Sequence, residues 1–309
     1  MKAIVFERLG GPEVMELQDV PDPVPADDEV LVEIEAVGVN FRDVYERLED
    51  DYGAAAPAIM GIEGGGTTAA GERLAWAHGS KSYAERAAVK RGATVPIPDG
   101  VETDVAVAAL LQGMTAHYLV FDSYPIEDGD WVLVNAAAGG VGLMLTQLAK
   151  LRGGRVIAIT STEDKARLVR EAGADHVIGY DSFVEQTVEL SGGGVAAVYD
   201  GVGKTTFAPG FRALRPYGRM ILYGGSSGEP DPMEWRELSD GSIYVQRPTL
   251  RTYTRTPELL RERAAALFAL VESGDLKVRI GGRYPLADAR RAHEDLEARK
   301  TTGKLLLVP

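Results

Sequence analysis

A glycine-rich segment near the middle of the chain has the spacing of a phosphate-binding loop. The apolar residues 131–135 run into a series of small residues, 136–142 (AAAGGVG), and an apolar stretch follows. Ala137, Gly139 and Gly142 occupy the three small-residue places of the G-x-G-x-x-G pattern, with alanine at the first. In a strand–turn–helix context, this pattern brings a pyrophosphate against the backbone and the helix N-terminus. That context favours dinucleotide binding over a purely structural glycine turn.

The residues after the next predicted strand indicate which dinucleotide binds. A site for NAD places an Asp or Glu about 20 residues after the glycines, where it holds the ribose 2′-hydroxyl. Here Ser161 stands at that place and Lys165 follows it, and a hydroxyl with a cation suits a 2′-phosphate. Glu163 and Asp164 lie alongside, and a carboxylate turned inward would favour NADH instead. The missing carboxylate at position 161 favours NADPH.

The sequence contains no motif for metal-dependent or hydrolytic chemistry. The chain has no cysteine, and its four histidines, at positions 78, 117, 176 and 293, are too far apart in sequence to form a ligand motif. Neither a G-x-S-x-G elbow nor an H-E-x-x-H motif is present. We therefore expect no metal site and no acyl transfer.

The elements around the glycine-rich segment alternate between short apolar runs and amphipathic helices. Repeated β–α alternation with buried runs predicts a parallel, doubly wound sheet covered on both faces. The predicted strands are 131–135, 155–160, 176–179, 196–200, 219–224 and 242–245, and the predicted helices include 162–173 and 205–215.

The start of the chain has a different, mostly β texture. Strands are predicted at 2–7, 29–37, 83–89 and 94–97, a short helix at 41–48, and a flexible joint at Gly64 to Gly66. A helical stretch, 104–121, then leads into the alternating region. After residue 248 the alternation stops, and the helices 257–273 and 287–299 and the strand 304–308, which lack a parallel partner, return to the first domain. We predict domains at 1–113 and 114–247, with 248–309 completing the first.

Composition and charge exclude several other classes of protein. A chain of 309 residues suggests about two domains, and 33 basic against 46 acidic residues give a net charge of −13. This charge repels phosphate backbones and anionic membranes, so nucleic acid is not expected as a partner.

Residues 131–149 are uncharged and long enough to span a membrane, but the glycines within them indicate a strand, a turn and a helix. Charges at the start leave no room for a signal peptide, so we expect a cytoplasmic protein.

Motifs spread along the whole chain carry a resemblance to a known family. They are GGPE at 10–13, GVNFRD at 38–43, GIE at 61–63, AAAGGVG at 136–142, AGAD at 172–175, YDGVG at 199–203 and GK at 303–304. Together they resemble the medium-chain dehydrogenase/reductase superfamily and, within it, the zinc-independent NADPH:quinone oxidoreductases of the ζ-crystallin-like branch. The resemblance implies a GroES-like β-barrel domain plus a Rossmann domain, with the reaction at the cleft between them, and a homodimer.

The resemblance also implies the residues of the site. Ile62 replaces the histidine that precedes this glutamate in the zinc-dependent branch, which agrees with the missing cysteines. The catalytic residues would be Asn40, Tyr45 and Tyr52, of which Tyr52 would reach the substrate; simple packing is the alternative for both tyrosines. The residues at the cofactor would be Asn40, Tyr45, Ala137, Gly139, Gly140, Val141, Gly142, Ser161, Lys165, Tyr180, Gly225, Ser226 and Lys304.

Three functions remain open from the sequence. A quinone accepts hydride on an electron-poor ring, and its product takes a proton from water, so reduction of quinones needs no dedicated acid. An enone or enoyl substrate would need a proton donor, for which only Tyr45 or Tyr52 is a candidate. The third function is NADPH binding without turnover. The segment 65–72 is shorter than in relatives, which leaves the acceptor undecided.

Overall fold

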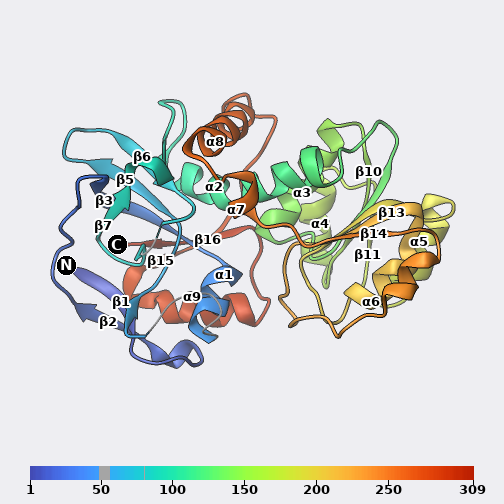
Figure 1. The fold of residues 1–309 in the computed structure, drawn as a ribbon, viewed down its shortest axis with the longest axis horizontal. Coiled ribbons are helices and arrows are strands. Elements are labelled where there is room, and N and C mark those ends of the chain that lie inside the picture. Colours follow the sequence, from blue (N-terminus) through green and yellow to red (C-terminus); the bar gives the residue numbers. More distant parts are fainter. Residues whose placement is uncertain (49–55, 80) are drawn as a thin grey trace. The chain divides into compact units, whose positions relative to one another are not determined.

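The computed structural model describes residues 1–48, 56–79 and 81–309, and the chain forms two compact units (Figure 1). The first unit contains Met1–Met114 and Thr254–Pro309, and the second contains Thr115–Tyr253. The domain boundaries predicted from the sequence lie at 113/114 and 247/248. Tyr52 falls outside the described residues.

The first unit is built on two β-sheets. The smaller sheet has the strand order β2-β1-β4, and the larger has the order β15-β16-β3-β5-β6-β8, with β7 also paired to β3. The bounds are β1 Lys2–Phe6, β2 Met15–Asp19, β3 Glu29–Val39, β4 Ala58–Ile59, β5 Gly64–Thr68, β6 Arg73–Trp76, β7 Arg86–Lys90, β8 Thr94–Pro96, β15 Ile280–Pro285 and β16 Lys304–Val308. The strand predicted at 29–37 is β3, and its side chains alternate in burial, with Val30, Val32 and Ile34 buried while Glu33 and Glu35 are exposed.

The glycines at 64–66 form a packed strand, so the predicted flexible joint is wrong. They belong to β5, which lies between β3 and β6. A Cβ on Gly66 would overlap the backbone carbonyl of Glu33, and one on Gly65 would lie 2.7 Å from a Val107 methyl group. These glycines therefore allow the strands to approach closely, a role that sequence pattern does not separate from flexibility.

The end of the chain completes the larger sheet of the first unit. Helices α8 (Pro257–Glu272) and α9 (Ala289–Glu297) precede β16, which pairs antiparallel with β3. The predicted strand 304–308 is β16, but its predicted lack of a parallel partner is wrong, because β15 pairs with it in parallel. The sequence of β15, with two glycines and an arginine, lacks the β-branched alternation that marks a strand.

Helices α1 (Phe41–Leu48) and α2 (Thr103–Tyr118) also begin in the first unit. A π-helical segment, Leu119–Ser123, continues α2. Among the described residues, only the helix Thr103–Ser123 has the length and apolar composition of a membrane span, and 67% of that window is buried inside the protein. Core helices of folded proteins have this same character.

The second unit is a six-stranded parallel sheet with helices on both faces, which confirms the predicted doubly wound fold (Figure 1). The strand order is β11-β10-β9-β12-β13-β14, so the order reverses beside β9. The strands are β9 Trp131–Val134, β10 Arg155–Ile159, β11 His176–Ile178, β12 Val195–Asp200, β13 Leu214–Leu222 and β14 Tyr244–Gln246. The helices are α3 Gly140–Leu151, α4 Glu163–Glu171, α5 Phe183–Ser191, α6 Phe207–Gly210 and α7 Leu250–Tyr253.

One predicted helix of this unit is much shorter than expected. The helix predicted at 205–215 is α6 followed by a 3₁₀ turn, Phe211–Ala213, and β13 begins at Leu214. Gly210 is a weak helix former, and Leu214 pairs with Val195 of β12. Strand pairing therefore places Leu214 in β13, although the local sequence pattern predicted it as the end of the helix.

Candidate functional site

The glycine loop, residues 136–142, connects β9 to α3 at the carboxyl edge of the parallel sheet. Gly139 is the N-cap of α3 and has an extended backbone, with φ −73° and ψ 171°. A Cβ on Gly139 would meet only the Ala136 carbonyl oxygen, at 3.3 Å, whereas one on Gly142 would lie 2.6 Å from Ala137 Cα. Gly142 therefore keeps the helix close to the strand, while Gly139 leaves open space beside a helix N-terminus. The first N–H groups of a helix lack intrahelical partners, so this arrangement fits a pyrophosphate.

Ser161 and Lys165 lie together after β10. The Lys165 ammonium donates to Ser161 Oγ at 3.4 Å, and Thr162 caps α4 by accepting from the Lys165 backbone N–H. The neighbouring Glu163 pairs with Arg170 at 2.5 Å, and this hydrogen bond lowers the pKa of Glu163. Arg170 thus engages one of the two carboxylates that could have favoured NADH. A hydroxyl and a cation remain together at the position where a 2′-phosphate would bind.

The other predicted residues of the second unit also follow its strands. Tyr180 comes after β11 and is 37% exposed, and Gly225 and Ser226 come after β13. The Ser226 N–H donates to the Gly201 carbonyl at 3.2 Å, which ties this loop to the end of β12. Ligands of open parallel sheets bind at the carboxyl ends of the strands, beside the point where the order reverses. All the predicted cofactor residues of this unit lie at that edge.

In the first unit, Asn40 belongs to a group of four polar side chains, of which Gln112 is half-buried and the others are buried. We call this group the Asn40 cluster: Asn40, Glu63, Gln112 and Lys304. Asn40 Nδ2 donates to Glu63 Oε2 at 2.9 Å, and Lys304 Nζ donates to Asn40 Oδ1 at 2.7 Å. Lys304 also donates to Glu63, and both side chains are fully buried. Gln112 Nε2 donates to Asn40 Oδ1 at 3.4 Å. The cluster therefore joins Asn40 and Lys304, which were predicted as site residues from two distant motifs, with Glu63 and Gln112, which were not.

A second buried chain of polar groups adjoins Asn40. Asp43 accepts from the Asn40 backbone N–H at 2.8 Å and from the Tyr83 hydroxyl at 3.0 Å, and that hydroxyl lies 3.0 Å from His293 Nε2. Burial, opposed mainly by the Asn40 N–H bond, raises the pKa of Asp43 to about 7. Burial, with Arg47 nearby, lowers the pKa of His293 to about 3, so this imidazole is neutral.

Of the two predicted tyrosines, the structure describes Tyr45, and Tyr52 lies outside the described residues. Tyr45 lies on α1, half-buried, with its ring centroid 6.2 Å from that of Phe41.

Three residues of these polar groups were not predicted from the sequence as site residues: Glu63, Asp43 and Gln112. Charged residues inside otherwise apolar or glycine-rich segments were the available signal for Glu63, because charges are rarely buried without a purpose.

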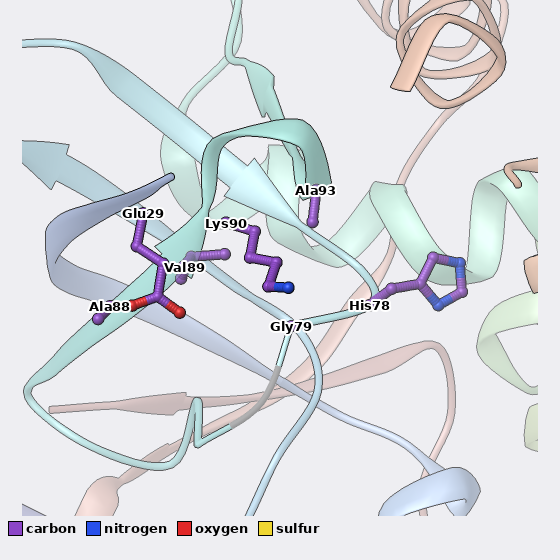
Figure 2. Close-up of a pocket in the computed structure, with 7 residues that line it drawn as sticks. All are labelled: Glu29, His78, Gly79, Ala88, Val89, Lys90 and Ala93. Carbon is purple, nitrogen blue, oxygen red and sulfur yellow. The ribbon is translucent and has the colours of Figure 1, made fainter. Parts of the chain in front are cut away.

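The described residues do not fit a zinc ion. The chain has no cysteine, and residues 1–48, 56–79 and 81–309 contain no group of three His, Asp or Glu side chains arranged to hold a metal. An open pocket of about 200 Å³ in the first unit is lined by residues of β3 and β7 and by their neighbours, and shares no residue with the predicted site (Figure 2). Its polar side chains are Glu29, His78 and Lys90.

Comparison with known proteins identifies the class. Residues 26–128 match the alcohol dehydrogenase GroES-like domain, and residues 140–266 match the zinc-binding dehydrogenase family. Together with the fold, these matches place the chain among the medium-chain dehydrogenases/reductases, as the sequence motifs indicate.

Three similar proteins narrow this class. A quinone oxidoreductase of Pseudomonas aeruginosa is 38% identical over 100% of this chain and 99% of its own length. A mycobacterial protein solved with NADPH is 45% identical, with a TM-score of 0.96 and complete coverage of both chains. The Escherichia coli quinone oxidoreductase solved with NADPH is 36% identical, with a TM-score of 0.97 and complete coverage of both. The chain belongs to the quinone oxidoreductase family.

Proposed function

We propose that this chain is an NADPH-dependent quinone oxidoreductase that works without zinc. The observation that carries the proposal is the open glycine loop at the N-terminus of α3, in a chain whose full-length relatives reduce quinones or bind NADPH. The bound cofactor supplies a hydride from its nicotinamide ring, and the protein orients it.

The second unit would bind the phosphates of the cofactor. The backbone of Gly139, Gly140 and Val141 and the α3 N-terminus would hold the pyrophosphate, with Ala137 and Gly142 keeping the loop close to the sheet. Ser161 and Lys165 would hold the 2′-phosphate through charge-assisted hydrogen bonds. Tyr180, Gly225 and Ser226 would border the rest of the cofactor.

The first unit would supply the surroundings of the reaction. Asn40, Tyr45 and Lys304 would border the cofactor, and Tyr52 would reach the substrate. A hydroquinone anion takes its proton from water, so none of these side chains needs to act as an acid. Neutral quinones and other electrophilic acceptors are therefore the expected substrates.

We further propose a cytoplasmic homodimer. Two-fold dimers are the commonest oligomers, and β14 leaves an open sheet edge with Tyr244 57% exposed and Val245 39% exposed. Light scattering of the purified protein checks the dimer, for which the expected mass is twice that of the 33.1 kDa chain. A mass of one chain at micromolar concentration would refute it.

A comparison of acceptors tests the reaction. NADPH absorbance is followed with 1,4-benzoquinone, with an enone, and with no acceptor. We expect benzoquinone to be reduced much faster than the enone, with no consumption when the acceptor is omitted. Faster enone reduction would assign the chain to reduction of activated C=C bonds, and NADPH binding without turnover of either acceptor would indicate a non-catalytic role.

A further inference from the structure

The carboxamide of Asn40 is fully engaged inside the protein. Nδ2 donates to Glu63 Oε2 at 2.9 Å and to the Gly38 carbonyl at 3.3 Å. Oδ1 accepts from Lys304 at 2.7 Å and from Gln112 at 3.4 Å. Two donor hydrogens and two acceptor lone pairs are all that an asparagine side chain offers. Asn40 is 4% exposed, so its amide is anchored within the first unit.

The ion pair beside Asn40 permits one orientation of this amide. Lys304 has only donors and an ionised Glu63 has only acceptors. Rotating the amide by half a turn would direct its NH₂ at the ammonium and its oxygen at the carboxylate. Both contacts would be repulsive in a site where neither charge reaches water. Lys304 and Glu63 therefore determine which way the carboxamide faces.

Because of these contacts, the Asn40 side chain does not cap the N-terminus of α1. It directly precedes α1, where an asparagine oxygen ordinarily accepts from a backbone N–H of the first helical turn. Here the Asp43 N–H donates to the Asn40 backbone carbonyl at 3.0 Å, while Asn40 Oδ1 accepts from Lys304 instead. Asp43 still caps the Asn40 N–H, as in half of a capping box. The start of α1 is thus fixed by long-range contacts as well as local ones.

Gly38, near the end of β3, leaves the space that the Glu63 and Lys304 side chains occupy. A Cβ on Gly38 would overlap Glu63 Oε2 and would lie 2.8 Å from Lys304 Cε. Leu111 of α2 donates its backbone N–H to Glu63 Oε1 at 2.8 Å, so the carboxylate has a partner on each oxygen. The ion pair therefore belongs to a polar network in which both Glu63 oxygens and the whole Asn40 amide have partners, while Gln112 Oε1 has none. The network connects the ends of β3 and β5 with α2 and β16.

We propose that Glu63 and Lys304 are positioning residues, which act on the reaction by holding the Asn40 carboxamide and the start of α1 in one orientation. The proposal rests on the proposed function, in which Asn40 borders the cofactor; the fully buried Lys304 lies directly behind Asn40 and acts on the cofactor through it. Neither charge serves as a proton donor or a hydride carrier. Displacements of about 1 Å in a positioned group can lower a rate about 100-fold, so loss of the anchor should be visible in kcat.

The main variant is the double substitution Lys304→Met with Glu63→Gln. It removes both charges together, so no unpaired buried charge remains to unfold the protein. We expect kcat for NADPH-dependent benzoquinone reduction to fall about 10- to 100-fold. The same double substitution in an Asn40→Ala background should lower kcat by less than about twofold, because residues that act through Asn40 are not additive with it.

A readout in the cofactor-free protein is independent of activity. Hydrogen–deuterium exchange of peptides covering residues 37–45 should rise in the double variant and stay unchanged in a matched control, Arg215→Met with Asp130→Asn. That control removes an ion pair of the second unit, 3.0 Å long and with the Asp130 side chain 9% exposed, which lies outside the elements that carry Asn40. We expect this control to lower thermal stability and to leave kcat per folded protein within about twofold of the wild type.

A milder variant covers the case in which the double substitution does not fold. Glu63→Asp keeps both charges and withdraws the carboxylate by one methylene, so exchange at 37–45 should rise and kcat should fall. A folded Glu63→Asp or double variant with wild-type exchange and kcat would overturn the proposal, as would additive losses with Asn40→Ala. If the wild type lacked quinone reductase activity, the proposed function would fail, while the exchange experiment would still test the anchoring of Asn40.

Discussion

The glycine loop of the second unit and the Asn40 cluster of the first differ in the groups they present: the loop presents backbone, and the cluster consists of polar side chains bonded to one another. The loop consists of small residues within seven consecutive positions, and it offers backbone N–H groups and open space. The cluster joins side chains from positions 40, 63, 112 and 304, all with partners and mostly buried. The loop is suited to receive an anion, and the cluster is suited to stay in place. This contrast predicts that substitutions in the loop change binding, while substitutions around the cluster change positioning and stability.

The largest expected effect is the loss of cofactor binding in Gly139→Val. The extended backbone at Gly139 accepts a β-branched residue, and only the Ala136 carbonyl lies near a Cβ there, so the protein should fold. The valine would occupy the space that a pyrophosphate needs, and NADPH affinity should fall more than about 100-fold. Fluorescence titration with NADPH measures this.

Gly142→Ala is the matched control, because its Cβ would meet the Ala137 backbone at 2.6 Å. It should lower the melting temperature, whereas Gly139→Val should leave it nearly unchanged. A folded Gly139→Val protein with wild-type affinity for NADPH would remove the loop from the cofactor site.

The same contrast separates what sequence could predict from what it could not. The loop was predictable because its pattern is local and lies between a strand and a helix. Asn40 and Lys304 were assigned through family motifs. Their direct contact, and the contact of each with Glu63, depend on the pairing of β3 with β16 and β5, and β16 lies more than 200 residues after β3. No periodicity encodes such a pairing. Gly65 and Gly66 were misread for the same reason, since only the packed neighbours distinguish close approach from flexibility.

A smaller effect, about 10- to 150-fold, is expected for Lys165→Ala. If Lys165 binds the 2′-phosphate, the lost charge-assisted hydrogen bonds are worth about 1.5–3 kcal/mol. NADPH affinity should fall by that factor while NADH affinity stays constant, and raising the salt concentration should narrow the preference of the wild type. Dissociation constants for both cofactors on both proteins measure this. Equal losses for the two cofactors would show that Lys165 supports the fold instead.

The last expected effect is on stability and leaves cofactor binding aside: stability should depend on pH through Asp43. Because its folded pKa of about 7 lies above its ordinary value of 3.8, its contribution is fully present below pH 3.8 and is lost as the pH rises towards 7. Asp43→Asn removes this dependence, so the variant should gain about 2–3 kcal/mol relative to the wild type between pH 5 and pH 8. Denaturant unfolding at both pH values measures the difference, in which the contribution of His293 cancels. A difference that does not change with pH would contradict the raised pKa.

Turnover by the metal-free protein tests the account most directly. The protein is dialysed against EDTA, checked for zinc by elemental analysis, and mixed anaerobically with NADPH and 1,4-benzoquinone. We predict one NADPH consumed per quinone, at the rate of the untreated protein, with NADH much less effective. A rate that disappears with EDTA and returns with zinc would contradict the proposed zinc-free reaction.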